Sequence, residues 1–238
     1  MLDPERTRIE FRTWGRYALF TDPVTRVGGE KCSYHIPTYE ALKGVAKSIY
    51  WKPTLIWVID EVRVMKPIRT QTKGTKPRDI HGGNTLAIYT FLADVDYQVQ
   101  AHFEWNEHRA ELAEDRRVGK HLAIARRMLE RGGRQDIFLG TRDCQGYAEP
   151  CAFGSGEGVY DGAGELVYGL TFHGFDYPDE TGRDELRTRF WMPKMENGVI
   201  RFVRPEDCKV SRFVRSMHAK DFMLGRNHCA AETEASEV

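Results

Sequence analysis

The sequence predicts an α+β fold, because two helical patterns are separated by stretches that alternate polar and apolar residues. Leu42, Val45, Ala46 and Ile49 recur at the spacing of one helix face, and a second helical pattern covers residues 118–131. Strand patterns cover residues 6–14, 55–65, 86–92, 97–105, 137–139 and 147–153. Taken as about four strands that alternate with the two helices, these patterns give the order β-α-β-β-α-β of a ferredoxin-like (RRM-like) domain.

Local signals support these elements one by one. The first strand alternates polar and apolar residues from Arg8 onward. Thr38 has the character of an N-cap for the first helix, which ends before Lys52-Pro53. The strand at 55–65 contains a continuous apolar run, and the residues from 66 to 83 are expected to form a basic loop rich in Gly and Pro. The second helix ends at Gly132-Gly133, as glycine favours.

The remainder of the chain predicts a small antiparallel β extension. A glycine-rich junction at 154–158 is followed by strand patterns at 159–172, 186–195 and 199–203. Asn197-Gly198 is typical of a tight hairpin turn. We therefore expect a ferredoxin-like RNA-binding and catalytic domain over 1–155, a small antiparallel β domain over 156–224, and a flexible acidic tail over 225–238.

Composition indicates a globular chain in a reducing compartment. Hydrophobic residues make up 41% and charged residues 29%. The five cysteines include no C-x-x-C pair, which favours free thiols over disulfides or a structural zinc. No apolar run approaches a membrane span, and residues 1–6 lack a signal-peptide pattern. We expect a cytoplasmic protein with no membrane partner, no cofactor and no metal site.

The net charge is zero, but positive charge is concentrated in the first half of the chain. Residues 1–134 hold 23 Lys/Arg against 17 Asp/Glu, whereas residues 135–238 hold 12 against 18. A basic half suits a polyanion such as RNA, although solvated surface charge would give the same pattern. The candidate RNA-binding residues are Arg26, Lys66, Arg69, Lys73, Lys76, Arg78, Arg116, Arg117, Arg126 and Arg127.

Three side chains could perform chemistry on RNA, whose 2′-hydroxyl is a built-in nucleophile. His121, at the predicted start of the second helix, could act as a base or an acid. Lys120 could neutralise a pentacovalent phosphate, and Tyr50 could position the 2′-hydroxyl or share in proton transfer. Each has a plain structural alternative: a core histidine, a solvated lysine and a tyrosine at the edge of the core.

Several segments resemble one known family. They include S-Y-H-I-P-T-Y-E-A-L-K-G-V-A-K-S-I-Y-W-K-P, V-D-Y-Q-V-Q-A-H-F-E, G-K-H-L and F-L-G-T-R-D-C-Q-G-Y. In order and spacing they are similar to the CRISPR-associated endoribonuclease of type I-C systems, the subtype-C or Dvulg branch of the fifth Cas family. The resemblance runs to about Pro205 and places that family's catalytic Tyr, Lys and His on Tyr50, Lys120 and His121.

The resemblance implies metal-independent cutting of CRISPR precursor RNA at the 3′ base of each repeat hairpin. The products would be a 2′,3′-cyclic phosphate and a 5′-hydroxyl. It also implies that the protein stays on the 5′ handle as a subunit of the type I-C surveillance complex. The alternative is a non-catalytic scaffold that caps guide RNA. A metal-dependent nuclease would need clustered carboxylates, and the close pairs Asp94/Asp96 and Glu114/Asp115 carry no recognisable motif.

Overall fold

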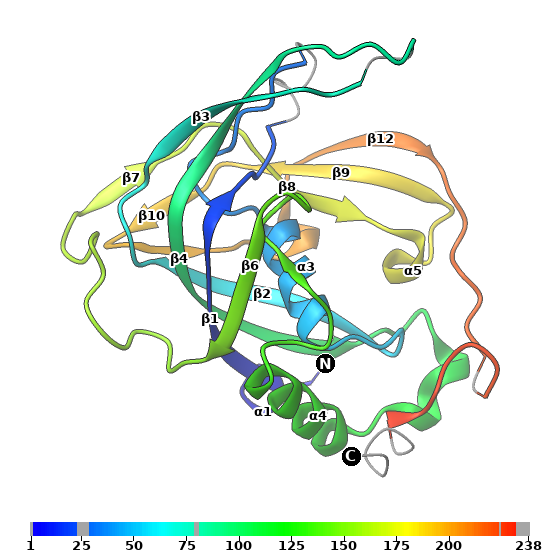
Figure 1. Ribbon diagram of the computed structural model, residues 1–238. Coiled ribbons are helices and arrows are strands. Elements are labelled where there is room, and N and C mark those ends of the chain that lie inside the picture. Colours follow the sequence, from blue (N-terminus) through cyan, green and yellow to red (C-terminus); the bar gives the residue numbers. More distant parts are fainter. Residues whose placement is uncertain (1, 23–28, 79–80, 224, 232–238) are drawn as a thin grey trace.

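The computed structural model describes residues 2–22, 29–78, 81–223 and 225–231, and its main feature is a nine-stranded sheet (Figure 1). The strand order is β5-β6-β1-β4-β2-β11-β10-β7, with β3 also paired to β4, and every pair is antiparallel. These strands are β1 (Arg8–Ala18), β2 (Leu55–Val64), β3 (Thr70–Thr75), β4 (Ala87–Trp105), β5 (Ile137–Phe138), β6 (Gln145–Pro150), β7 (Glu165–Val167), β10 (Lys194–Glu196) and β11 (Val199–Arg201).

Two helices cover one face of this sheet. Helix α3 (Tyr39–Ile49) packs on β2, while α4 (Val118–Glu130) packs on β1 and β6, and the two helices contact each other. Both were predicted close to their observed ends. Short helices precede them: α1 (Pro4–Thr7) before β1, and the 3-10 helix η1 (Ala110–Asp115) before α4. Apart from β3 and β5, these strands and helices follow one another in the chain as β1-α3-β2-β4-α4-β6. In the sheet, the four strands of this series lie side by side in the order β6-β1-β4-β2.

Helix α3 begins and ends as its sequence indicates. The Thr38 side chain accepts a 3.2 Å hydrogen bond from the main-chain N–H of Ala41, which satisfies a donor of the first turn. The apolar face is buried through Leu42 and Ile49. Tyr50 is the C-cap, in extended backbone, and its N–H still donates to the carbonyl of helix residue 46. Tyr50 therefore lies in the core, at the C-terminal end of the helix.

Three strand predictions were wrong in detail. The patterns at 86–92 and 97–105 belong to one strand, β4, which passes through Asp94 with a left-handed φ of 53°. The expected loop after Lys66 contains β3, whose Thr-rich sequence pairs with the outer half of β4. No strand was predicted for β12 (Val210–Ser216). Long-range pairing, which has no local signal, decides all three cases.

The C-terminal strands take part in two sheets. β11 pairs with β2, so residues after the predicted boundary at 155/156 continue the main sheet. β8 (Thr171–Asp176), β9 (Glu185–Trp191) and β12 form a second, three-stranded sheet. The predicted strands at 159–172 and 186–195 were both too long. The second of them divides into β9 and β10, which belong to different sheets. The Asn197-Gly198 turn was confirmed, with φ of 48° and 83°.

The second sheet packs against α3. The His173 ring on β8 stacks on Tyr39 of α3 with ring centroids 4.2 Å apart. Helix α5 (Pro178–Thr181) connects β8 to β9, and the 3-10 helix η2 (Pro205–Asp207) precedes β12. Within the described ranges, no helix is both long and apolar enough to span a membrane.

Candidate active site

Tyr50 and His121 meet inside the protein although 71 residues separate them in the chain. Tyr50 caps the end of α3, and His121 lies in the first turn of α4. The Tyr50 hydroxyl oxygen lies 2.9 Å from Nδ1 of His121, and both residues are 0% exposed. The packing of α3 beside α4 therefore brings two of the three predicted catalytic residues into one contact.

The second ring nitrogen of His121 identifies its tautomer. Nε2 lies 2.6 Å from the main-chain carbonyl oxygen of Asp115. A carbonyl can only accept, so Nε2 must carry the hydrogen, and Nδ1 of the neutral ring is left as an acceptor. The Tyr50 hydroxyl consequently donates its hydrogen to His121.

The surroundings of His121 favour the neutral ring. Burial lowers its pKa below the usual 6.5, and the Trp105 ring packs edge-on at a centroid distance of 5.4 Å. Asp115 opposes this shift, whereas the electrostatic effects of Lys52 and His228 add to it. Because desolvation is the largest cause, His121 is a free base at neutral pH.

The Asp115 carboxylate hydrogen-bonds to two segments that are far apart in the chain and lies close to the ring of His121. Asp115 is 4% exposed at the end of η1. Its Oδ2 accepts a 2.8 Å hydrogen bond from the Thr54 hydroxyl, and its Oδ1 accepts one of 2.6 Å from the N–H of Ala231. Nε2 of His121 and Nε2 of His228 lie 3.6 and 3.5 Å from Oδ2.

Two lysines lie close to the pair in the sequence. Lys120, directly before His121, is half-buried in the first turn of α4. Lys52 is 5% exposed, and its Nζ donates a 2.8 Å hydrogen bond to the carbonyl oxygen of Cys229. Lys52 also acts electrostatically on His121. Lys52 is therefore a cation beside His121 that the sequence did not predict.

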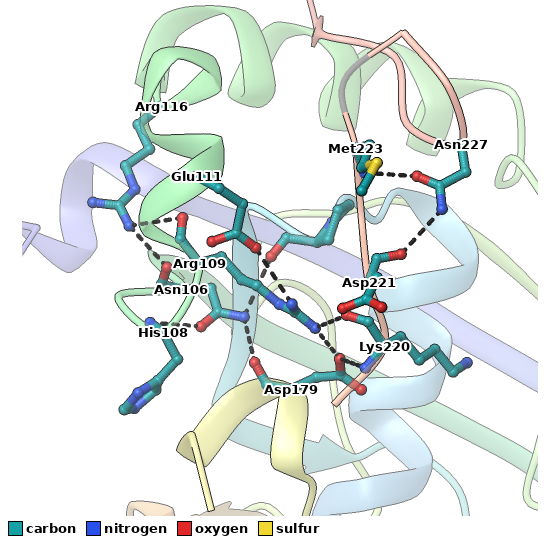
Figure 2. A network of polar contacts seen from close by, with 11 residues as sticks. Asn106, His108, Arg109, Glu111, Arg116, Asp179, Lys220, Asp221, Met223 and Asn227 are labelled. Atoms are coloured by element: carbon teal, nitrogen blue, oxygen red, sulfur yellow. Dashed lines mark hydrogen bonds and ion pairs between the residues drawn. The ribbon is translucent and has the colours of Figure 1, made fainter. Parts of the chain in front are cut away.

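A C-terminal segment, whose described residues are 217–223 and 225–231, is anchored to the body, in part by the polar contacts in Figure 2. The Arg109 guanidinium donates to the Lys220 carbonyl and to the Asp179 carboxylate, while the Lys220 N–H donates to Asp179 at 2.9 Å. Farther along, the Asn227 side-chain amide donates to the Asp221 carbonyl at 3.0 Å. These contacts hold the segment against η1 and α5.

The end of the C-terminal segment covers the site. Cys229 bonds to Lys52, and Ala231, which is 1% exposed, bonds to Asp115. The sequence predicted a flexible acidic tail over 225–238, and within its described part Cys229 and Ala231 make these two hydrogen bonds to the body. The remainder of the predicted tail, 232–238, lies outside the described residues.

Comparison with known proteins identifies the family. The model of the Cas5d family, described as CRISPR-associated protein (Cas_Cas5), matches residues 8–203 of the chain. The chain belongs to the Cas5d family. Tyr50 and His121 both lie within the matched residues.

Curated Cas5d relatives are similar over part of their length. A protein from Mannheimia succiniciproducens, named CRISPR pre-crRNA endoribonuclease Cas5d, is 30% identical over 52% of this chain and 64% of its own length. One of the same name from Thermus thermophilus is 28% identical over 75% of this chain and 78% of its own. The match thus spans just under two thirds of the first relative. A solved structure titled "Crystal Structure of CRISPR-associated Protein" superposes with a TM-score of 0.71 at 33% identity, covering 86% of this chain and 96% of that one.

The cations predicted to bind RNA fall into two groups in this Cas5d chain, while Arg26 lies outside the described residues. One group follows β3 and its flanks: Lys66, Arg69, Lys73, Lys76 and Arg78. The other belongs to the region of α4: Arg116 and Arg117 lie between η1 and α4, and Arg126 and Arg127 lie on α4. Figure 1 shows β3 and α4 at opposite ends of the main sheet. Only the second group therefore belongs to the same part of the fold as His121.

Some of these cations already have partners within the protein. Nζ of Lys66 bonds to Asp94 at 2.7 Å, and Nζ of Lys73 lies 3.3 Å from the centroid of the Tyr17 ring. Arg116 pairs with Glu107 at 3.0 Å (Figure 2 shows Arg116 beside η1). The cations whose side chains are largely exposed are Arg69, Lys76, Arg78, Arg117 and Arg126.

Sequence reasoning missed the residues that support His121. Lys52 stands two residues after Tyr50, so its proximity to the pair had a local signal. Asp115 was noticed only as half of an acidic pair with Glu114. Nothing in the sequence connects Ala231 to Asp115, because that contact depends on how the last residues return to the body.

Proposed function

We propose that this Cas5d protein is a metal-independent endoribonuclease that cuts CRISPR precursor RNA at the 3′ base of the repeat hairpin. The observation that carries the proposal is the 2.9 Å contact between the Tyr50 hydroxyl and Nδ1 of His121, where a phenol faces a neutral imidazole acceptor. The names of the two curated relatives, both pre-crRNA endoribonucleases, support the same substrate class.

The pair supplies a path for the proton of the nucleophile. Tyr50 passes its hydroxyl proton to Nδ1 of His121 while it accepts the proton of the 2′-hydroxyl. The 2′-oxygen then bonds to phosphorus, and His121 becomes an imidazolium beside the Asp115 carboxylate, 3.6 Å from Nε2. This assigns the base to His121 and the relay to Tyr50.

Lys120 acts on the other side of the phosphate. Its ammonium group neutralises the pentacovalent phosphorane and gives a proton to the 5′-oxygen as the P–O5′ bond breaks. The N–H groups in the first turn of α4 add partial positive charge there. The products are a 2′,3′-cyclic phosphate and a 5′-hydroxyl, with one proton moved to His121 and one taken from Lys120.

Access to the pair requires movement of the C-terminal segment. Tyr50 and His121 are both 0% exposed, and residues 228–231 bond to Lys52 and Asp115 beside them. We infer that the scissile phosphate enters when these few hydrogen bonds open. When residues 228–231 move away, the ammonium group of Lys52 loses its bond to Cys229 and turns toward the RNA backbone.

The fold suits a protein that holds RNA after cutting it. We infer a ferredoxin-like domain over residues 1–155, supported by the strand order β6-β1-β4-β2, with residues 156–224 as its β extension. The exposed cations near β3 and α4 would follow the RNA backbone in the cytoplasm. The protein would then remain on the 5′ handle within the type I-C surveillance complex.

One experiment tests the reaction. The protein is incubated with its own repeat RNA in excess EDTA, with a matched RNA that carries a single 2′-deoxy sugar 5′ of the scissile phosphate. We expect full cleavage of the first RNA to a cyclic phosphate, and binding without cleavage of the second. Cleavage of the deoxy RNA, or activity that requires added magnesium, would refute this mechanism.

The second candidate function is a scaffold that caps guide RNA without cutting it. The complete burial of Tyr50 and His121 favours this alternative, because RNA cannot reach the two side chains while the protein stays closed. A scaffold would bind the all-ribose and deoxy RNAs equally and release no product from either.

A further inference from the structure

We propose that Asp115 is a positioning residue for His121, fixing which ring nitrogen carries the hydrogen and stabilising the ring once it is protonated. This inference rests on the proposed function, since it concerns the base of that reaction. Asp115 does not touch the RNA in this scheme. It acts through two groups, its main-chain carbonyl and its side-chain carboxylate.

The main-chain carbonyl of Asp115 sets the tautomer. It accepts the Nε2 hydrogen of His121 at 2.6 Å, which leaves Nδ1 free to face Tyr50. With the opposite tautomer, Nδ1 would carry the hydrogen, and the lone pair needed to accept the Tyr50 proton would no longer be available. The position of this one carbonyl therefore decides whether the base is functional.

The carboxylate helps to hold that carbonyl in place. η1 ends at Asp115, and its carbonyl also accepts a 2.9 Å hydrogen bond from the main-chain N–H of Arg117. The side chain supplies a second restraint by accepting from the Thr54 hydroxyl at 2.8 Å, a bond that persists when the C-terminal segment opens, and in the closed protein it also accepts from the Ala231 N–H at 2.6 Å. Both donors are neutral, so they satisfy the carboxylate oxygens without cancelling its charge.

The remaining negative charge acts on His121 as it gains a proton. Asp115 Oδ2 lies 3.6 Å from Nε2, and its charge raises the pKa of a ring that burial makes a weak base. Other charged or titratable groups facing His121 are Lys52 before β2, His228 on the C-terminal segment, and Tyr50 at the end of α3. Among these groups Asp115 is the one acid that favours the imidazolium.

The test is a pH–rate profile of Asp115→Asn on repeat RNA under single-turnover conditions. Loss of the charge should lower the pKa of His121, so the acid limb of the profile moves to lower pH by about one unit. The plateau should fall by up to about tenfold, the factor equivalent to one pKa unit. Glu114→Gln is the matched control, because it removes the same charge from the exposed neighbour and should leave the profile unchanged.

A second variant keeps the test decisive if Asp115→Asn is too unstable to assay. Thr54→Val retains the charge but removes the hydroxyl that anchors the carboxylate. We expect slower cleavage with an unshifted acid limb, and nitrogen NMR of labelled histidine should show both His121 tautomers instead of one. A wild-type rate and a single tautomer in Thr54→Val would overturn the positioning role.

Failure of this inference is distinguishable from failure of the proposed function. If His121→Ala abolishes cleavage while Asp115→Asn has the wild-type profile, only the role of Asp115 is wrong. If His121→Ala cleaves normally, the proposed base is wrong, and the role of Asp115 falls with it.

Discussion

Lys52 donates a 2.8 Å hydrogen bond to the carbonyl oxygen of Cys229, tying the chain just after Tyr50 to the C-terminal segment. A second bond joins the N–H of Ala231 to Asp115, whose carboxylate lies beside His121. The two bonds close the protein over the pair that the proposed reaction needs. Opening them is therefore a step that precedes chemistry.

Removal of residues 224–238 should accelerate cleavage. Two hydrogen bonds at about 1 kcal/mol each correspond to roughly a 30-fold change in the open population. Single-turnover rates at saturating protein measure the effect. Removal of residues 232–238 alone is the control, since Cys229 and Ala231 keep their bonds. Equal rates for both truncations would show that this segment does not limit access.

Tyr50→Phe and His121→Ala should be non-additive. Each change breaks the same proton path and should lower the cleavage rate by about 10²–10⁴, with little loss of RNA affinity. The double variant should be no slower than the slower single variant, because residues that act as a unit fail together. His35→Ala, an exposed histidine, serves as the control. Multiplicative losses would mean that the two residues act independently.

Lys120→Ala should be rescued by a better leaving group. If Lys120 protonates the 5′-oxygen, RNA with sulfur in place of that oxygen should be cleaved by Lys120→Ala at close to the wild-type rate, because a thiolate leaves without a proton. His121→Ala should not be rescued, since its defect lies in the attack. Rates on the oxygen and sulfur substrates are compared for each variant, and rescue of His121→Ala instead would reverse the two assignments.

The exposed cations beyond β3 should bind RNA through its backbone. Replacing Lys76 and Arg78 with Ala should weaken repeat RNA binding and flatten its salt dependence by about 0.7 for each single-stranded phosphate that is no longer neutralised. The cleavage rate at saturating protein should persist. Lys194→Ala, an exposed lysine paired with Glu165, should leave the slope unchanged. If the salt dependence of RNA binding is unaltered in the double variant, these two cations do not bind the backbone, and the RNA path lies along α4 instead.

The sequence by itself determined the local elements around the site. The apolar spacing from Leu42 to Ile49 and the Thr38 cap specify α3, and Gly132-Gly133 ends the helix that carries His121. These signals are local, because a helix face and its caps lie within a few residues of one another. The choice of Tyr50, Lys120 and His121 for the chemistry came instead from their residue types and from the resemblance of their segments to one family.

Only the tertiary structure decided how those residues are joined and covered. Helix packing brings the Tyr50 hydroxyl to His121, and the carbonyl that fixes the histidine tautomer belongs to Asp115, six residues earlier on a different element. The contact between Asp115 and Ala231 spans 116 residues. A single pair of this kind leaves no periodicity in the sequence, since its geometry arises from the packing of whole elements and not from any neighbour in the chain.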